Sequence, residues 1–241
     1  MSTASALDRV IVALDSMSDK EAIDFTNGPA RDFKFFKVGL ELYLAFGADL
    51  VHKLSRGGEA RIFLDLKLHD IPNTVAGAIK SLRGLPVEFL TIHLGGGADM
   101  IERALESAQE YLPKTTLLGV SVLTSMARQD LSAVWGVDED SEQTFERLFA
   151  LAKKRKMSGL VCSPHEVTLA KKIYGHQNLT LVTPGVRFQD EIDSGAIGDQ
   201  KRVLSPQEAL KLGSNYLVMG RSLTKAKNID SRILELRSMT I

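Results

Sequence analysis

The sequence contains a single cysteine, Cys162, among 241 residues. No disulfide can therefore form within the chain, and such sparing use of cysteine is typical of proteins in a reducing cytoplasm. Cys162 ends an apolar run that begins at Gly159, and this setting is typical of a buried thiol rather than a nucleophile. We therefore expect a cytoplasmic protein that has no structural disulfide.

The chain also lacks net charge and long apolar runs. Thirty basic residues balance thirty acidic ones, so nothing in the overall charge favours nucleic acid or an anionic membrane as a partner. No apolar run approaches the length of a membrane-spanning helix, and the first six residues lack the pattern of a signal peptide. We expect neither nucleic acid nor a membrane as a partner, and local geometry must hold any bound phosphate.

Short apolar runs rich in β-branched or aromatic residues, in contrast, recur along the whole chain. Stretches with helical periodicity separate them, such as 76–83 and 100–108, and Ser205 followed by Pro206 and Glu208 predicts the start of another helix. Strands that alternate with helices predict parallel βαβ units. Eight of them, spaced by about 30 residues, favour a closed (β/α)8 TIM barrel, and because no linker divides the chain we expect a single domain over residues 1–241. The predicted strands are 10–14, 33–38, 61–66, 89–93, 116–122, 159–162, 180–183 and 216–219.

Polar residues gather at the carboxyl ends of these predicted strands, where barrels of this kind hold their active sites. The most informative segment is 63–74, in which Asp65 and Lys67 alternate with Leu64 and Leu66. Side chains alternate along a strand, so the two charged groups point the same way, about 7 Å apart. The residues just before them are apolar on both faces, as in a buried parallel strand. This pattern favours a functional site over a solvated surface strand.

Lys37 lies inside the otherwise apolar sequence 35–39. A buried ammonium needs a partner, and since the second and third strands are neighbours, Asp65 is the expected one. The alternative is that the lysine chain extends to the rim of the barrel. Together with Lys67 and Asp70, these residues form an array of alternating charge, in which the lysines stay protonated and the carboxylates ionised. Such an array contains a proton donor and needs no metal.

These motifs, in this order, resemble the orotidine 5′-phosphate decarboxylase family. The resemblance implies a (β/α)8 barrel that decarboxylates orotidine 5′-monophosphate to UMP and CO2, the final step of de novo pyrimidine biosynthesis, with neither metal nor cofactor. It also implies a homodimer with shared active sites. It extends from Val10 to about Thr224 and rests on Asp65-x-Lys67-x-x-Asp70-Ile-Pro-Asn-Thr74, on Lys37-Val-Gly39 before it and on Met219-Gly-Arg221 after it.

The resemblance implies a role for each matching residue. Lys67 would deliver a proton to C6 as CO2 leaves, and Asp65 would face the substrate carboxylate. Lys37 would hold the ribose and Asp65, and Asp15 would bind a ribose hydroxyl. The segment 189–201, which on composition is a mobile surface loop, would become a lid over the phosphate. The other implied substrate contacts are the partner subunit's Asp70, Ile71 and Thr74, then Thr124 or Ser125 at the pyrimidine edge, Pro184, and finally Arg187, Gln200, Gly220 and Arg221 around the phosphate.

Two other functions fit part of the pattern. A magnesium-dependent sugar-phosphate decarboxylase or an aldolase-like barrel would share Asp-x-Lys-x-x-Asp but would carry a metal-binding acid on the second strand. Lys37 stands there instead, and a charged lysine cannot bind magnesium. A non-catalytic nucleotide-binding barrel would not need every charged residue that the reaction requires. The sequence therefore favours the decarboxylase.

Overall fold

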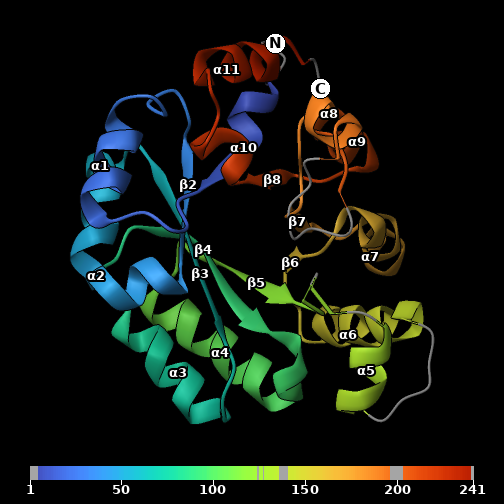
Figure 1. Ribbon diagram of the computed structural model, residues 1–241. Coiled ribbons are helices and arrows are strands. Elements are labelled where there is room, and N and C mark those ends of the chain that lie inside the picture. The colour runs from blue at the N-terminus through green and yellow to red at the C-terminus, as the bar shows by residue number, and fades with distance from the viewer. Residues whose placement is uncertain (1–4, 124, 127, 136–140, 196–202, 240–241) are drawn as a thin grey trace.

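The eight strands form a closed barrel of parallel strands in the order of the sequence, from β1 to β8 (Figure 1). The computed structural model describes residues 5–123, 125–126, 128–135, 141–195 and 203–239. Each strand overlaps the apolar run that predicted it, and the predicted (β/α)8 fold is confirmed. The strands are β1 (Val10–Ala13), β2 (Phe35–Gly39), β3 (Arg61–Leu68), β4 (Val87–His93), β5 (Thr116–Val120), β6 (Gly159–Val161), β7 (Thr180–Thr183) and β8 (Tyr216–Met219).

Helices surround this barrel (Figure 1). The predicted helices near residues 76–83 and 100–108 are α3 and α4, and α9 starts as expected at Ser205, whose hydroxyl accepts from the backbone N–H of Glu208. The α-helices of the described chain are α1 (Asp19–Asn27), α2 (Leu40–Leu54), α3 (Pro72–Ser81), α4 (Gly97–Tyr111), α5 (Arg128–Trp135), α6 (Ser141–Lys154), α7 (Val167–Tyr174), α8 (Gln189–Asp193), α9 (Pro206–Leu212), α10 (Arg221–Thr224) and α11 (Ile229–Ser238). Four short 3-10 turns accompany them, η1 (Ala6–Arg9), η2 (Arg56–Gly58), η3 (Leu94–Gly96) and η4 (Pro164–Glu166).

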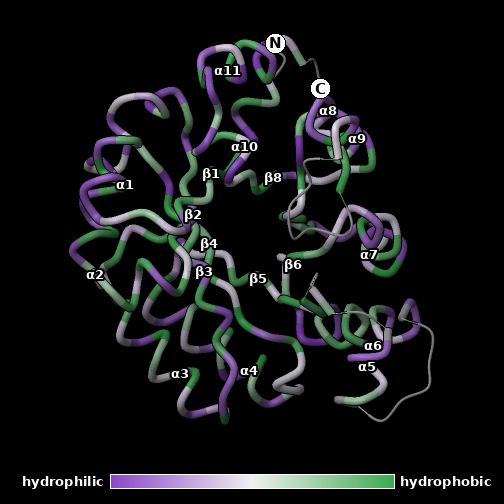
Figure 2. The backbone as a smooth tube through the Cα atoms, in the orientation of Figure 1, coloured by the Kyte–Doolittle hydropathy of each residue, from purple (hydrophilic) through white to green (hydrophobic). Residues whose placement is uncertain are grey.

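Apolar side chains form two cores, one on each face of the closed sheet. The larger core lies between the strands and the helices, and the helices alternate between hydrophobic and hydrophilic residues along their length (Figure 2). The smaller core fills the barrel interior, where the Phe35 ring lies 4.9 Å from that of Tyr216 and 6.0 Å from that of Phe89, measured between ring centroids. The interior is therefore a packed floor rather than a channel.

Polar side chains lie above this floor because residues two apart on a strand share a face. Two positions beyond each of the three floor phenylalanines, the inward residue is charged or polar. These pairs are Phe35 and Lys37 on β2, Phe63 and Asp65 on β3, and Phe89 and Thr91 on β4. Side chains on the inward face of these strands are therefore apolar in the barrel interior and polar at the carboxyl end.

The segment after β7 differs from the sequence prediction. We expected a surface loop over 189–201, but its first residues form helix α8. The carboxylate of Glu191 accepts from the backbone N–H of Phe188 at 2.9 Å, which stabilises the start of this helix. The loop prediction was therefore wrong for 189–193, and residues 196–202 lie outside the described part of the chain. No helix among the described residues is long and apolar enough to cross a membrane.

Candidate active site

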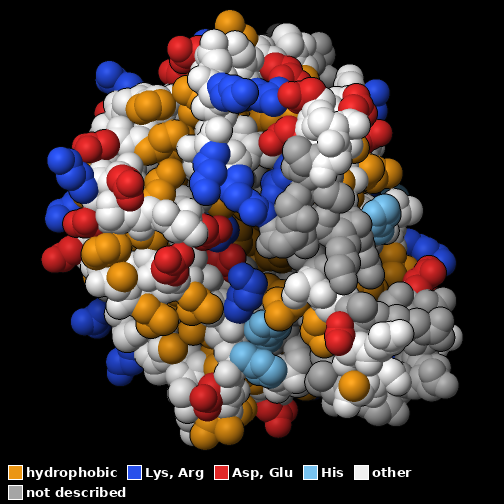
Figure 3. Space-filling view, viewed as in Figure 1, with side chains coloured by type: hydrophobic (Ala, Val, Ile, Leu, Met, Phe, Trp, Pro, Cys, Tyr) orange, Lys and Arg blue, Asp and Glu red, His pale blue; other side chains and the backbone are white. Residues whose placement is uncertain are grey.

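A cavity of about 570 Å³ opens at the carboxyl ends of the strands. Figure 3 shows it as a hollow near the centre of the face, with basic and acidic side chains beside it. This volume is within the range of pockets that bind small ligands. Eight of the residues singled out in the sequence line it: Asp15, Lys37, Asp65, Lys67, Pro184, Arg187, Gly220 and Arg221.

Four of these residues form a chain of alternating charge. The Nζ of Lys67 lies 2.7 Å from Oδ2 of Asp65, and the same oxygen lies 3.6 Å from Nζ of Lys37. Lys37 in turn donates to Oδ1 of Asp15 at 2.8 Å. The prediction that Lys37 pairs with Asp65 is confirmed, and Asp15 is a second, closer partner of Lys37 that the sequence did not predict. The first strand ends beside the second, and the turn after it brings Asp15 over the Lys37 ammonium.

Asp65 is the buried centre of this chain, with a side chain only 12% exposed. Burial acts to raise the pKa of its carboxyl, but the charges of Lys37 and Lys67 and the hydrogen bonds from Lys67 and Thr91 outweigh burial. The pKa of Asp65 therefore lies below its ordinary value. Asp65 stays ionised at neutral pH and fixes the positions of two ammonium groups.

The backbone of Lys67 is unusual, with a positive φ of 48°. A residue other than glycine in this region costs of order 1–3 kcal/mol, and such strain is often found at functional sites. It occurs where the pairing of β3 with β4 jumps from Leu64–Leu90 to Leu68–Ile92. The irregularity brings the Lys67 side chain into the cavity, next to Asp65.

Two residues that shape this array were given no role from the sequence, although Gly39 stands in one of the quoted motifs. Thr91 is fully buried and its hydroxyl contacts both Asp65 and Lys67. Its position two residues after Phe89 on an inward face could have revealed it. Gly39 is needed for space, because a Cβ there would lie 2.7 Å from Oδ1 of Asp15 and 3.1 Å from Nζ of Lys37. Further lining residues that we did not predict include Ser16, Leu123, Ser163, Thr224 and Lys225.

The other end of the cavity is basic. It is formed after β7 and β8 by Pro184, Arg187, Gly220 and Arg221, with Lys225 close by in the sequence. Across the whole lining, five basic side chains (Lys37, Lys67, Arg187, Arg221 and Lys225) outnumber two carboxylates (Asp15 and Asp65). An electropositive cavity in a chain of zero net charge favours an anionic ligand.

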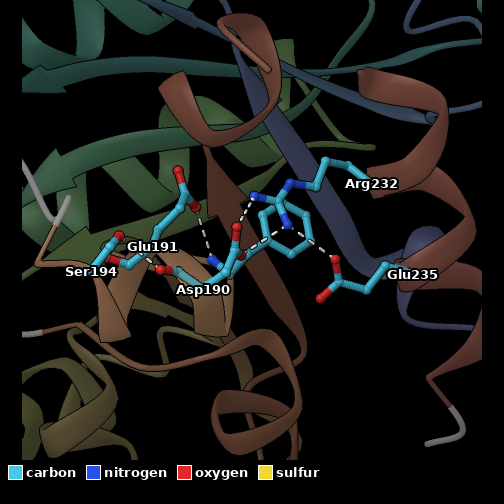
Figure 4. A network of polar contacts seen from close by, with 6 residues as sticks. Asp190, Glu191, Ser194, Arg232 and Glu235 are labelled. Carbon is cyan, nitrogen blue, oxygen red and sulfur yellow. Dashed lines mark hydrogen bonds and ion pairs between the residues drawn. The ribbon is translucent and has the colours of Figure 1, made fainter. Parts of the chain in front are cut away.

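The C-terminal helix holds the segment that follows Arg187. Arg232 of α11 donates to both carboxylate oxygens of Asp190, at 2.9 and 2.7 Å, and also contacts Glu235 (Figure 4). Its guanidinium lies 4.1 Å from the centroid of the buried Phe188 ring. A bidentate ion pair combined with stacking on a ring is a specific arrangement that lysine cannot reproduce. Arg232 thus fixes the residues directly after Arg187.

Other predicted site residues lie away from this cavity or outside the description. Asp70, Ile71 and Thr74 lie in and just after the connection between β3 and α3, are exposed, and do not line the cavity of their own chain. Ser125 is exposed and also absent from the lining. Thr124 and Gln200 lie outside the described residues.

Cys162 also lines the cavity, but it behaves as a structural residue. Its side chain is buried, and burial raises the pKa of its thiol well above the ordinary value, so a thiolate is not formed at neutral pH. The sequence-based interpretation of this cysteine as a buried thiol is confirmed. Within the described part of the chain, no cluster of three or more histidine, cysteine or acidic residues could hold a metal ion.

Comparison with known proteins identifies relatives over nearly the whole chain. The model of the orotidine 5′-phosphate decarboxylase / HUMPS family matches residues 8–235. Orotidine 5′-phosphate decarboxylase of Geobacillus sp. (strain WCH70) is 43% identical over 225 residues, which cover 92% of each chain. The enzyme of that name from Opitutus terrae is 42% identical over 90% of this chain and 91% of the relative. The crystal structure of orotidine 5′-phosphate decarboxylase from Lactobacillus acidophilus has a TM-score of 0.79 at 31% identity, covering 96% of this chain and 100% of the other. This chain belongs to the orotidine 5′-phosphate decarboxylase / HUMPS family.

Proposed function

We propose that this enzyme decarboxylates orotidine 5′-monophosphate to UMP and CO2, with the ammonium of Lys67 as proton donor and without a metal or cofactor. The observation that carries the proposal is the contact of 2.7 Å between Lys67 and the buried Asp65 inside an electropositive cavity. The family supports the reaction. The geometry of this chain supports the roles of the residues.

Loss of CO2 leaves the electrons of the broken bond on C6 of the pyrimidine, in the plane of the ring. The site must therefore stabilise negative charge at one carbon. A fixed ammonium aimed at that carbon does so without reorganisation of solvent. Lys67 then gives its proton to C6, so that a C–H bond replaces the C–C bond, and its neutral amine regains a proton from water.

Asp65 is the organiser of this step. It contacts the ammonium groups of Lys37 and Lys67 and is itself held by Thr91. Because the two lysines share one carboxylate, both side chains are held in position before substrate arrives. In the proposed complex the substrate carboxylate lies close to Asp65, and the carbanion forms next to Lys67.

The basic end of the cavity would take the phosphate. A phosphate monoester carries roughly −1.5 to −2 charge at neutral pH, and arginine binds such groups in a bidentate way. Arg187 and Arg221 line this end of the cavity, after strands β7 and β8, whereas Lys67 lies on β3. Binding energy gained there can be used to order the reacting end of the substrate.

We further propose a cytoplasmic homodimer of single-domain barrels in which each site takes the partner subunit's Asp70, Ile71 and Thr74. Asp70 and Ile71 do not line the candidate active-site cavity of their own chain, and Ile71 is an apolar side chain that is 68% exposed. Leu40 and Leu44, which follow the neighbouring strand β2, are also exposed. Exposed apolar side chains next to a catalytic cavity are consistent with a subunit interface.

The test is the ultraviolet absorbance of orotidine 5′-monophosphate mixed with purified protein and excess EDTA. We expect the orotate chromophore to disappear with wild type and with Lys114→Ala, a variant of an exposed lysine after α4. With Lys67→Ala the rate should fall by at least about 10³-fold. Turnover close to that of wild type would contradict the role of Lys67. If wild type does not act on orotidine 5′-monophosphate but acts on a sugar phosphate when magnesium is added, the proposed reaction is wrong.

A further inference from the structure

Thr91 lies at the point where the sheet is irregular. Leu64 pairs with Leu90 and Leu68 pairs with Ile92, so three residues of β3, from Asp65 to Lys67, face Thr91 alone on β4. Thr91 is fully buried. Its side chain points inward with the floor residue Phe89, directly below the charged array.

One hydroxyl group makes both contacts across this irregularity. The backbone N–H of Lys67 donates to Oγ1 of Thr91 at 2.8 Å, and Oγ1 donates to Oδ1 of Asp65 at 2.9 Å. The first contact replaces the backbone acceptor that a regular ladder would offer to Lys67. Because Oγ1 accepts there, its single proton is available for Asp65.

We propose that Thr91 is a positioning residue for the proposed decarboxylation, and that its hydroxyl fixes the backbone of Lys67 and the rotation of the Asp65 carboxylate together. This inference rests on the proposed function. With Oδ1 bound to Thr91, Oδ2 is the oxygen that contacts both Lys67 and Lys37. The hydroxyl therefore determines where the proton donor lies relative to the substrate, although it touches no substrate itself.

The expected effect is on the chemical step rather than on binding. Displacement of a reacting group by about 1 Å can cost roughly 10²-fold in rate. The basic end of the cavity is formed by residues after β7 and β8, whereas Thr91 lies on β4, which pairs with β3 and β5. Loss of the hydroxyl should therefore lower kcat and leave KM within a few fold.

Two matched pairs isolate the hydroxyl. The first pair is wild type and Thr91→Val, in which a methyl group of similar size replaces the hydroxyl. The second pair is Thr91→Ser, which keeps the hydroxyl, and Thr91→Ala, which lacks it. Thr91→Ala and Thr91→Ser differ in the hydroxyl alone, so this second pair serves if Thr91→Val does not fold. Thr183→Val is the control, because Thr183 is also fully buried and its hydroxyl is bonded to Ser214 at 2.7 Å, outside the cavity lining.

We expect kcat to fall about 10–100-fold in Thr91→Val and Thr91→Ala, to stay within about 3-fold of wild type in Thr91→Ser, and to be unchanged in Thr183→Val. Equal kcat in the serine and alanine variants would overturn the proposal, as would a loss confined to KM. Crystal structures of wild type and Thr91→Val give a reading that is independent of turnover. We expect the valine variant to show a rotated Asp65 carboxylate or a changed φ at Lys67. If neither changes, Thr91 does not position the array, even where wild type proves inactive on orotidine 5′-monophosphate.

Discussion

The ammonium of Lys37 lies 2.8 Å from the carboxylate of Asp15, although 22 residues separate them in the sequence. This contact is at the open side of the array, because the Asp15 side chain is 53% exposed whereas that of Lys37 is 10% exposed. A ligand group that enters the cavity can therefore reach Asp15 without displacing Lys37 from Asp65. The space for the contact exists only because residue 39 is glycine.

Gly39→Ala should damage the site and leave the barrel folded. Its Cβ would lie 2.7 Å from an oxygen of Asp15, closer than such atoms approach, so the Asp15 carboxylate must move away from Lys37. We expect kcat/KM to fall about 10–100-fold, as for other small displacements of site groups. Steady-state kinetics and thermal unfolding measure the two effects separately.

Gly77→Ala is the matched control. Gly77 lies in α3, where an added Cβ has no heavy atom of another residue within 4 Å. Alanine in a helix is favoured over glycine by about 1 kcal/mol, so this variant should be fully active and no less stable than wild type. Full activity of Gly39→Ala would mean that the contact between Asp15 and Lys37 is dispensable.

Local patterns in the sequence were enough to predict much of the fold and the centre of the site. The alternation of Leu64, Asp65, Leu66 and Lys67 predicted a buried strand with both charged groups on one side, and both line the cavity. The irregular register at Lys67, however, was not predicted. Eight apolar runs at an average spacing of about 30 residues predicted the closed barrel. These features follow from the strand period and from the sequential order of strands in a barrel.

Other features depended on the paths of turns and on register, which local patterns do not determine. Asp15 lies in the turn after β1, so its contact with Lys37 could not be deduced from strand pairing. The strand period could have placed Thr91 on the inward face, but not the register jump that brings it to the backbone of Lys67. Helix α8 is held by Arg232, which lies 42 residues from Asp190 in the sequence. Contacts of this kind depend on the assembled tertiary structure.

Acid should remove the stabilising contribution of Asp65. A carboxyl whose pKa is lower in the folded than in the unfolded chain stabilises the fold above its unfolded pKa of about 3.9, and the contribution is lost as pH falls towards its folded pKa. The pKa of Asp65 is shifted in this direction. Asp65→Asn should therefore be less stable than wild type at pH 7, by about 3 kcal/mol, because it leaves two lysines without their shared partner.

Urea unfolding between pH 7 and pH 3 measures this difference. It should shrink as the pH falls below about 4, because there the unfolded wild-type chain binds a proton at Asp65 that the folded chain does not yet bind. Asp49→Asn, at an exposed position of α2, should follow the wild-type curve throughout. A difference that stays constant across this range would mean that the charge of Asp65 contributes nothing to stability.

Arg232→Lys should weaken substrate binding from a distance. Lysine keeps the charge but loses the bidentate contact with Asp190 and the stacking on Phe188, which directly follows Arg187. We expect a loss of about 1–2 kcal/mol in the free energy of unfolding. KM should rise several fold, while kcat stays within about 2-fold, because the reacting end is not affected.

Arg237→Ala on the same helix is the control for a surface ion pair. Arg237 contacts Asp32 at 2.8 Å, but both side chains are about half exposed. Its removal should change the free energy of unfolding by less than about 1 kcal/mol and leave KM unchanged. If Arg232→Lys raises KM no more than Arg237→Ala does, α11 does not position the segment after Arg187.

Hybrid dimers provide the sharpest test of a shared site. Lys67→Ala and Asp70→Ala should each be nearly inactive alone, the second because each site would lack the partner subunit's Asp70. In a hybrid dimer one site has both mutations and the other has neither. When equal amounts of the two variants exchange subunits at random, half of the dimers are hybrids. One of the two sites in each hybrid is intact, so about a quarter of the wild-type activity should return. If native mass spectrometry shows subunit exchange and no activity returns, Asp70 acts within its own subunit or not at all, and the exposed connection after β3 needs another explanation.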